Sequence, residues 1–88
     1  MAITTQTIRV KVLFFGRLKD IVGLAEEPCE LAEGATIESL FADLVKRNTD
    51  LARFRPSLVA SRNQEFAPWS TALRAHDEVA FLPPVSGG

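Results

Sequence analysis

The side chains that most often carry catalysis are few in this sequence and form no recognised motif. The 88 residues contain no Gly-x-Ser-x-Gly elbow, no Walker loop and no dinucleotide-binding glycine pattern. The one histidine, in His76-Asp77, falls in a predicted tight turn, where a solvated side chain is expected. The one cysteine, Cys29, has no histidine or basic cluster beside it, so we interpret it as an unreactive thiol. Trp69 is either an interface anchor or a loop residue that covers the core.

The remaining candidate for chemistry is the end of the sequence, which runs Pro83, Pro84, Val85, Ser86, Gly87 and Gly88. Two prolines stiffen such a tail toward polyproline II, at about 3.1 Å per residue, so we expect the terminal carboxylate ~15–20 Å from the sheet. Glycines without Cβ atoms let the tip enter a narrow channel of another protein. A carboxylate is a poor electrophile, so we expect adenylation by ATP in a partner enzyme before a sulfur or amine nucleophile takes the acyl group. The alternative is an idle, frayed terminus.

Composition excludes several classes of protein. The hydrophobic fraction is 47% and the charged fraction 24%, which is ordinary for a globular chain and excludes wholesale disorder. Ten Lys and Arg against eleven Asp and Glu give a net charge of −1, which argues against nucleic acid as a partner. One cysteine and one histidine are too few for a disulfide scaffold or a structural zinc site. We expect no metal and no bound cofactor.

The N-terminal sequence MAITTQTIRV has no positive segment followed by an apolar run, as an export signal would. The longest early apolar run, residues 12–15, is far shorter than the ~20 residues that span a bilayer. We therefore expect a soluble, cytoplasmic protein that contacts no membrane.

Hydrophobic periodicity predicts the elements that must position the tail. Alternation with a period of two residues predicts strands, because successive side chains of a strand point to opposite faces. Pro28 restricts one of these strands to a sheet edge. Apolar residues from Ile37 to Val45 recur at helical spacing after Thr36, a plausible N-cap, and predict one amphipathic helix. We expect a helical turn over 17–22 and a loop over 48–56. The predicted strands cover residues 8–15, 26–32, 58–62, 65–67 and 78–82.

This order predicts an α+β domain in which one main helix packs on one face of a mixed sheet. The first and last strands are the most apolar, so we expect them to be adjacent and parallel, as in a β-grasp (ubiquitin-like) fold. We assign residues 1–82 to a single domain and 83–88 to a flexible tail.

The same alternation predicts a docking surface. If the even positions of the first strand, with Val79 and Phe81, face the helix, the intervening side chains lie on the other face, which nothing in the sequence covers. An exposed apolar patch beside the tail is typical of a protein interface. The side chains predicted to form it are Leu13, Phe15, Phe66, Ala80 and Leu82.

Two stretches of sequence carry a resemblance. Residues 77–88 read DEVAFLPPVSGG and residues 10–18 read VKVLFFGRL, and Ala35-Thr36-Ile37 and Asn63 fit the same pattern. Together they resemble the small subunits of molybdopterin synthase, a family of ubiquitin-like sulfur carriers, over most of residues 8–88. The ending Pro-Pro-Val-Ser-Gly-Gly is the specific part. His76 departs from the glycine that is common there, although histidine tolerates a left-handed turn.

The resemblance implies a function in molybdenum cofactor biosynthesis. Gly88 would be adenylated by a ubiquitin-activating-type adenylyltransferase that uses ATP, and converted to a thiocarboxylate with sulfur from a donating enzyme. The tail would then enter the large synthase subunit and give sulfur to cyclic pyranopterin monophosphate. Catalytic side chains would belong to the large subunit, and this chain would be its non-catalytic sulfur donor.

Two alternatives remain at the level of sequence. Related carriers for thiazole, cysteine or tRNA thiolation share Gly-Gly but usually lack the preceding Pro-Pro-Val-Ser. The other alternative is a protein modifier that is joined to lysines, or a binding module whose tail is idle.

Overall fold

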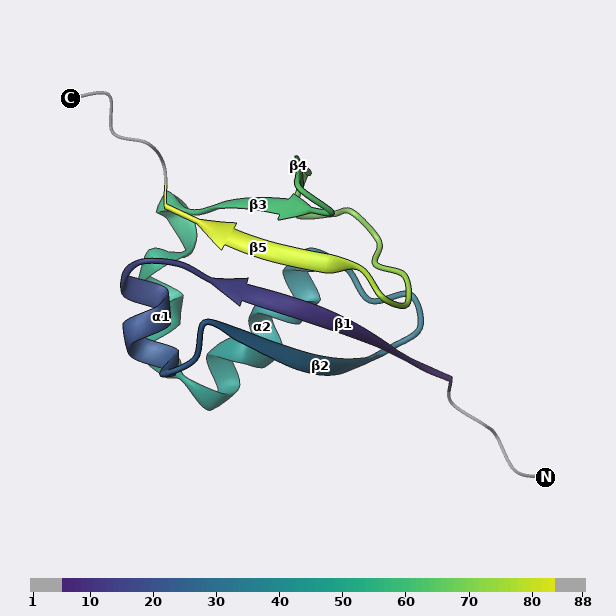
Figure 1. Ribbon diagram of the computed structural model, residues 1–88, viewed down its shortest axis with the longest axis horizontal. Coiled ribbons are helices and arrows are strands. Elements are labelled where there is room, and N and C mark those ends of the chain that lie inside the picture. Colours follow the sequence, from purple (N-terminus) through teal and green to yellow (C-terminus); the bar gives the residue numbers. More distant parts are fainter. Residues whose placement is uncertain (1–5, 84–88) are drawn as a thin grey trace.

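The computed structural model describes residues 6–83, and the predictions for Pro84, Val85, Ser86, Gly87 and Gly88 lie outside the described residues. Five strands form one mixed sheet in the order β2-β1-β5-β3-β4, and the helices lie on one of its faces (Figure 1). The sequence predicted this β-grasp arrangement correctly. The elements are β1 (Thr7–Phe14), α1 (Arg17–Val22), β2 (Glu26–Ala32), α2 (Ile37–Arg47), the 3-10 helix η1 (Thr49–Ser57), β3 (Val59–Arg62), β4 (Glu65–Phe66) and β5 (Glu78–Leu82).

The first and last strands lie side by side inside the sheet and run parallel, as predicted. Val12 lies opposite Val79, and Phe14 opposite Phe81. Strand β2 pairs with β1 in antiparallel register and forms one edge of the sheet, which suits Pro28 because a proline cannot donate a ladder hydrogen bond. The parallel pair directs the ends of β1 and β5 to the same side of the molecule, where the tail begins.

Helix α2 begins at a reciprocal cap. The Ser39 backbone N–H donates to Thr36 Oγ1 at 3.1 Å, and the Thr36 backbone N–H donates to Ser39 Oγ at 2.9 Å. This capping box satisfies two N–H groups that the first helical turn leaves free, as expected from the predicted N-cap at Thr36. Within residues 6–83, no helix combines the length and the apolar character needed to cross a membrane.

The core lies between the sheet and the helices. Val10, Val12 and Phe14 of β1 are at most 2% exposed, and Val79 and Phe81 of β5 are fully buried. The burial of β1 therefore alternates as predicted, while on β5 the predicted inward residues are buried and Ala80 between them is also only 6% exposed. From the helical side the core receives Leu18, Ile37, Leu40, Phe41, Leu44 and Leu51.

The segment after α2 differs from its prediction. A loop was expected over 48–56, but Thr49–Ser57 forms a run of 3-10 turns with Leu51 buried and Phe54 partly buried. A 3-10 helix has three residues per turn and few buried side chains, so it leaves no helical stripe in the sequence. Its C-terminal end brings the chain to β3 at Leu58.

Candidate functional site

The sheet face that carries no helix is divided into a charged end and an apolar end. At the charged end, Lys11 Nζ lies 3.6 Å from Glu26 and 3.8 Å from Glu78. Further along the same two central strands, Leu13 of β1 lies opposite Ala80 of β5. The division follows the sequence, because the outward residues of β1 change from charged to apolar toward its end. The apolar end is the one at which β1 and β5 both end (Figure 1).

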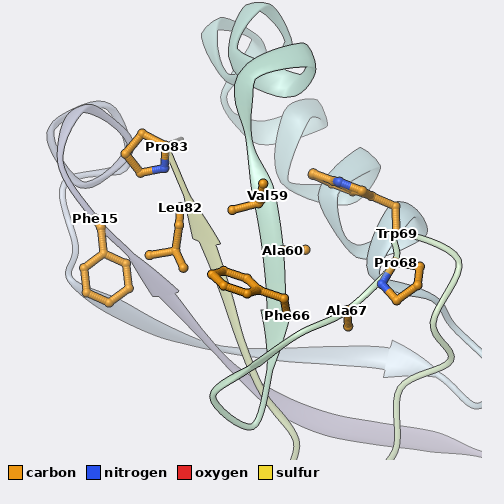
Figure 2. A pocket seen from close by; sticks show the side chains of 9 residues that line it. All are labelled: Phe15, Val59, Ala60, Phe66, Ala67, Pro68, Trp69, Leu82 and Pro83. Carbon is orange, nitrogen blue, oxygen red and sulfur yellow. The ribbon is translucent and has the colours of Figure 1, made fainter. Parts of the chain in front are cut away.

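Exposed apolar side chains gather at that end. Phe15 is 43% exposed, Val59 39% and Phe66 78%. With Leu82 and Pro83 they line a shallow hollow of about 810 Å³. Figure 2 shows Phe15, Leu82 and Phe66 on one side of β3, with Trp69 beyond it. Contiguous apolar surface of this kind is typical of a site that binds another protein.

The predicted interface residues therefore share one face, although they contribute differently. Leu13 and Leu82 are half-buried, and Ala80 is only 6% exposed, so Ala80 lies in the floor of an adjoining hollow with Ser61. Sequence analysis missed Val59, which lies opposite Leu82 in the β3–β5 pairing. Within the strand predicted over 58–62, the side chains of Leu58 and Ala60 share one face and Val59 between them points to the other, which was a usable signal.

Strand β5 also determines where the tail begins. Leu82 is its last residue, and Pro83 lines the apolar hollow. Pro83, the last described residue, therefore lines the same hollow as Phe15 and Phe66. A partner that covers the hollow is adjacent to the origin of the tail.

Trp69 packs against the core, as one of the two interpretations of its sequence position expected. It also lines the apolar hollow. Its ring stacks on Phe81 with centroids 5.4 Å apart and meets Phe41 edge-on at 5.3 Å. The Arg55 guanidinium carbon lies 3.5 Å from the indole centroid, while Arg55 Nε donates to Glu38 Oε2 at 3.1 Å. Arg55 thus fastens η1 to α2 over the indole.

The His76-Asp77 pair is not a catalytic dyad. His76 adopts a φ of 71°, which confirms the tight turn. The Asp77 carboxylate is buried, and it accepts hydrogen bonds from the Arg74 backbone N–H at 2.8 Å and from Asn63 Nδ2 at 3.0 Å. One carboxylate oxygen therefore stabilises the turn over 74–77, and the other links that turn to Asn63 in the turn between β3 and β4.

Cys29 lies on the helix-covered side, away from the apolar hollow. Burial raises the pKa of its thiol, and the negative charge of Glu27 raises it further, although nearby Arg47 opposes both effects. A raised pKa disfavours the nucleophilic thiolate at neutral pH. The thiol is therefore not activated, in agreement with its interpretation from sequence.

Comparisons with known proteins match most of the chain. The model of the ThiS family matches residues 12–88. A molybdopterin synthase sulfur carrier subunit from Arabidopsis thaliana is 30% identical over 84 residues, covering 96% of this chain and 88% of that protein. The protein of the same name from Chlamydomonas reinhardtii is 35% identical over 83 residues, covering 92% of this chain and all of its own length, 100%.

Solved structures share the fold. SAMP1 from Haloferax volcanii superposes with a TM-score of 0.79 at 27% identity, covering 91% of this chain and 99% of that one. A protein–protein complex of subunits 1 and 2 of molybdopterin-converting factor from Helicobacter pylori contains a chain that matches with a TM-score of 0.62 at 26% identity. That match covers 92% of this chain and 100% of the other.

Proposed function

This chain belongs to the ThiS family, and we propose that it is the sulfur-carrier small subunit of a molybdopterin synthase. The observation that carries the proposal is the place where the last strand ends. Strand β5 ends at the rim of an exposed apolar hollow, and the residues after it end in Gly87-Gly88. The names of the relatives and the Helicobacter pylori complex of subunits 1 and 2 support the same assignment.

The chemistry proposed for Gly88 needs two steps on other proteins. Its carboxylate attacks the α-phosphate of ATP on a ubiquitin-activating-type enzyme, which forms an acyl adenylate and releases pyrophosphate. Hydrosulfide supplied by a donating enzyme then attacks the acyl carbon, and AMP leaves together with the sulfur's proton, so that the chain ends in a thiocarboxylate. Adenylation is required because a free carboxylate has no competent leaving group.

Delivery of the sulfur takes place in the large subunit. The apolar hollow docks on that subunit, and the tail enters its active site, where the small residues at the tip allow close approach of the backbone. The thiocarboxylate sulfur then forms a bond to carbon of cyclic pyranopterin monophosphate, and hydrolysis of the acyl–sulfur bond by water leaves the sulfur on the pterin and returns Gly88 as a carboxylate. The small subunit contributes the reactive group and its position, and the large subunit contributes the catalytic side chains.

Deletion of Gly88 tests this proposal. In a reconstituted synthase containing the activating enzyme, the sulfur donor and ATP, we expect the shortened chain to form no molybdopterin. We expect its melting temperature and its affinity for the large subunit to stay close to those of the full chain, because Gly88 lies beyond the sheet. Full activity without Gly88 would refute the carrier function.

A protein modifier is the second candidate, because an amine can take the same acyl adenylate. Its sign would be a ladder of covalent conjugates on a denaturing gel that disappears with Gly88. Conjugates without molybdopterin formation would favour the modifier, and molybdopterin without conjugates would favour the sulfur carrier.

A further inference from the structure

Phe66 is the most exposed of the large hydrophobic side chains in residues 6–83, yet the element that carries it is very short. It is 78% exposed and is not packed against the buried core. Strand β4 comprises Glu65 and Phe66 alone, and in the sheet it pairs only with β3. Two residue pairs cannot hold a hairpin in one position by themselves. Contacts outside β4 must therefore fix the direction in which the Phe66 side chain points.

The turn between β3 and β4 supplies part of this constraint. Asn63 has a φ of 52° and Gln64 a φ of 71°, so both central residues are left-handed, as in a tight two-residue hairpin. Beyond the turn, the Ala67 backbone N–H donates to the Ala60 carbonyl at 3.0 Å. The turn sets the twist of the hairpin, and β3 joins the hairpin to β5, but the turn itself lies beyond the last β3–β5 pair, Arg62 with Val79, and needs a connection of its own.

Asn63 makes that connection. Its backbone N–H donates to the Glu78 carbonyl at 2.7 Å, and its side-chain Oδ1 accepts from the Glu78 backbone N–H at 2.9 Å. Its Nδ2 donates to Asp77 Oδ1 at 3.0 Å, while Asp77 Oδ2 is held by the Arg74 backbone N–H. Asp77 is only 7% exposed, so its two bonds are partly buried, whereas the bond between Asn63 Oδ1 and the Glu78 N–H is exposed. The hairpin turn is thereby fastened to the start of β5.

We propose that Asn63 and Asp77 are positioning residues for docking: they hold the β3–β4 hairpin so that Phe66 is already oriented for the large subunit. The inference rests on the proposed function, because it assumes that Phe66 contacts that subunit. Fixing an exposed anchor before association lowers the ordering cost of binding. Loosening the turn should therefore weaken binding even though no contact residue has changed.

The test measures the affinity of the full chain for the purified large subunit by titration calorimetry. Asn63→Gly removes the side-chain bonds and tolerates the left-handed backbone. Gln64→Gly is the matched control, because it places glycine at the other left-handed position of the turn and removes an exposed side chain that lines only the adjoining hollow and for which the described residues show no hydrogen bond. We expect Kd to rise about three- to tenfold for Asn63→Gly and less than about twofold for Gln64→Gly.

A double-mutant cycle separates positioning from a general loss of structure. Phe66→Ala alone should raise Kd by about tenfold or more. In the Phe66→Ala background, Asn63→Gly should add less than about twofold, because there is no longer an anchor to position. An undiminished effect in that background, or wild-type affinity of Asn63→Gly, would overturn the inference. No effect of Phe66→Ala would instead refute the docking surface itself.

Asp77→Asn provides a second variant if Asn63→Gly does not fold. Arg74 and Asn63 donate to different oxygens of Asp77, and in an amide one of these oxygens becomes an NH2 group that faces a donor, so one of the two bonds is lost. We expect faster hydrogen exchange at the Ala67 amide and a parallel loss of affinity that Phe66→Ala again abolishes. Faster exchange with unchanged affinity would contradict the positioning role.

Discussion

The two faces of the sheet are built from the same strands under opposite constraints. On the helix-covered face, Val12, Val79 and Phe81 are fully buried. On the other face, the neighbouring Phe15 is 43% exposed, and Leu13 and Leu82 are half-buried. The covered face stabilises the domain and fixes the strand register, since a slip of one residue would exchange the faces. The open face is then free to carry an apolar surface, to which the proposed function assigns binding of the large subunit.

The largest effect should come from the covered face. Phe81→Ala removes a fully buried ring that contacts both Phe41 and Trp69. We expect a loss of about 3–5 kcal/mol in the free energy of unfolding, a large part of the roughly 5–15 kcal/mol typical of a domain. Urea denaturation followed by circular dichroism measures it. A loss below about 1 kcal/mol would contradict the description of the core.

The open face should show the reverse behaviour. Phe15→Asp places a charge in the proposed interface, so we expect affinity for the large subunit to fall by roughly a hundredfold. Because Phe15 is partly exposed, the free energy of unfolding should change by no more than about 1 kcal/mol. Binding titration and urea denaturation of the same sample provide the two numbers.

Leu24→Asp is the matched control for that variant. Leu24 is 49% exposed, like Phe15, but does not line the apolar hollow. We expect its affinity to stay within about twofold of wild type. Equal losses from the two substitutions would mean that the hollow has no special role.

The smallest effect concerns the junction of the two faces at Trp69. Arg55→Ala removes the cation above the indole and the bonds to Glu38, and should cost about 1 kcal/mol. The hydrogen bond from Arg55 lowers the pKa of Glu38. The contribution of the pair is therefore present above the ordinary glutamate pKa of about 4.3 and is lost as pH falls through the lower folded-state value.

Urea denaturation of wild type and Arg55→Ala between pH 7 and pH 3 checks this dependence. The difference between the two proteins should shrink at acid pH, because the protonated Glu38 no longer binds Arg55 as an ion pair. The part due to stacking on Trp69 should persist. A difference that grows toward acid pH would contradict the assignment.

The sequence predicted those features that follow from local periodicity. Alternation in β1 and β5 was sufficient to assign Val12 and Phe81 to the core and Leu13 and Phe15 to the open face. It did not predict that Ala80 would be nearly covered, because the exposure of a short side chain depends on the larger side chains around it.

Other features depend on residues far apart in the sequence. Arg55 contacts Glu38 and Trp69 only after η1 has packed against α2, and Asn63 reaches Asp77 only through the pairing of β3 with β5. Such polar contacts leave no periodic signal. The 3-10 turns of Thr49–Ser57 also lack a periodic signal, because their side chains form no long apolar stripe, and the sequence therefore did not predict them.

Intact-mass spectrometry tests the central claim most directly. The chain is produced together with its activating enzyme and sulfur donor, purified, and fragmented to locate any change. The account predicts a mass increase equal to the replacement of one oxygen by sulfur, located at Gly88 and absent when the activating enzyme is omitted. An unmodified Gly88 in a system that still makes molybdopterin would contradict it.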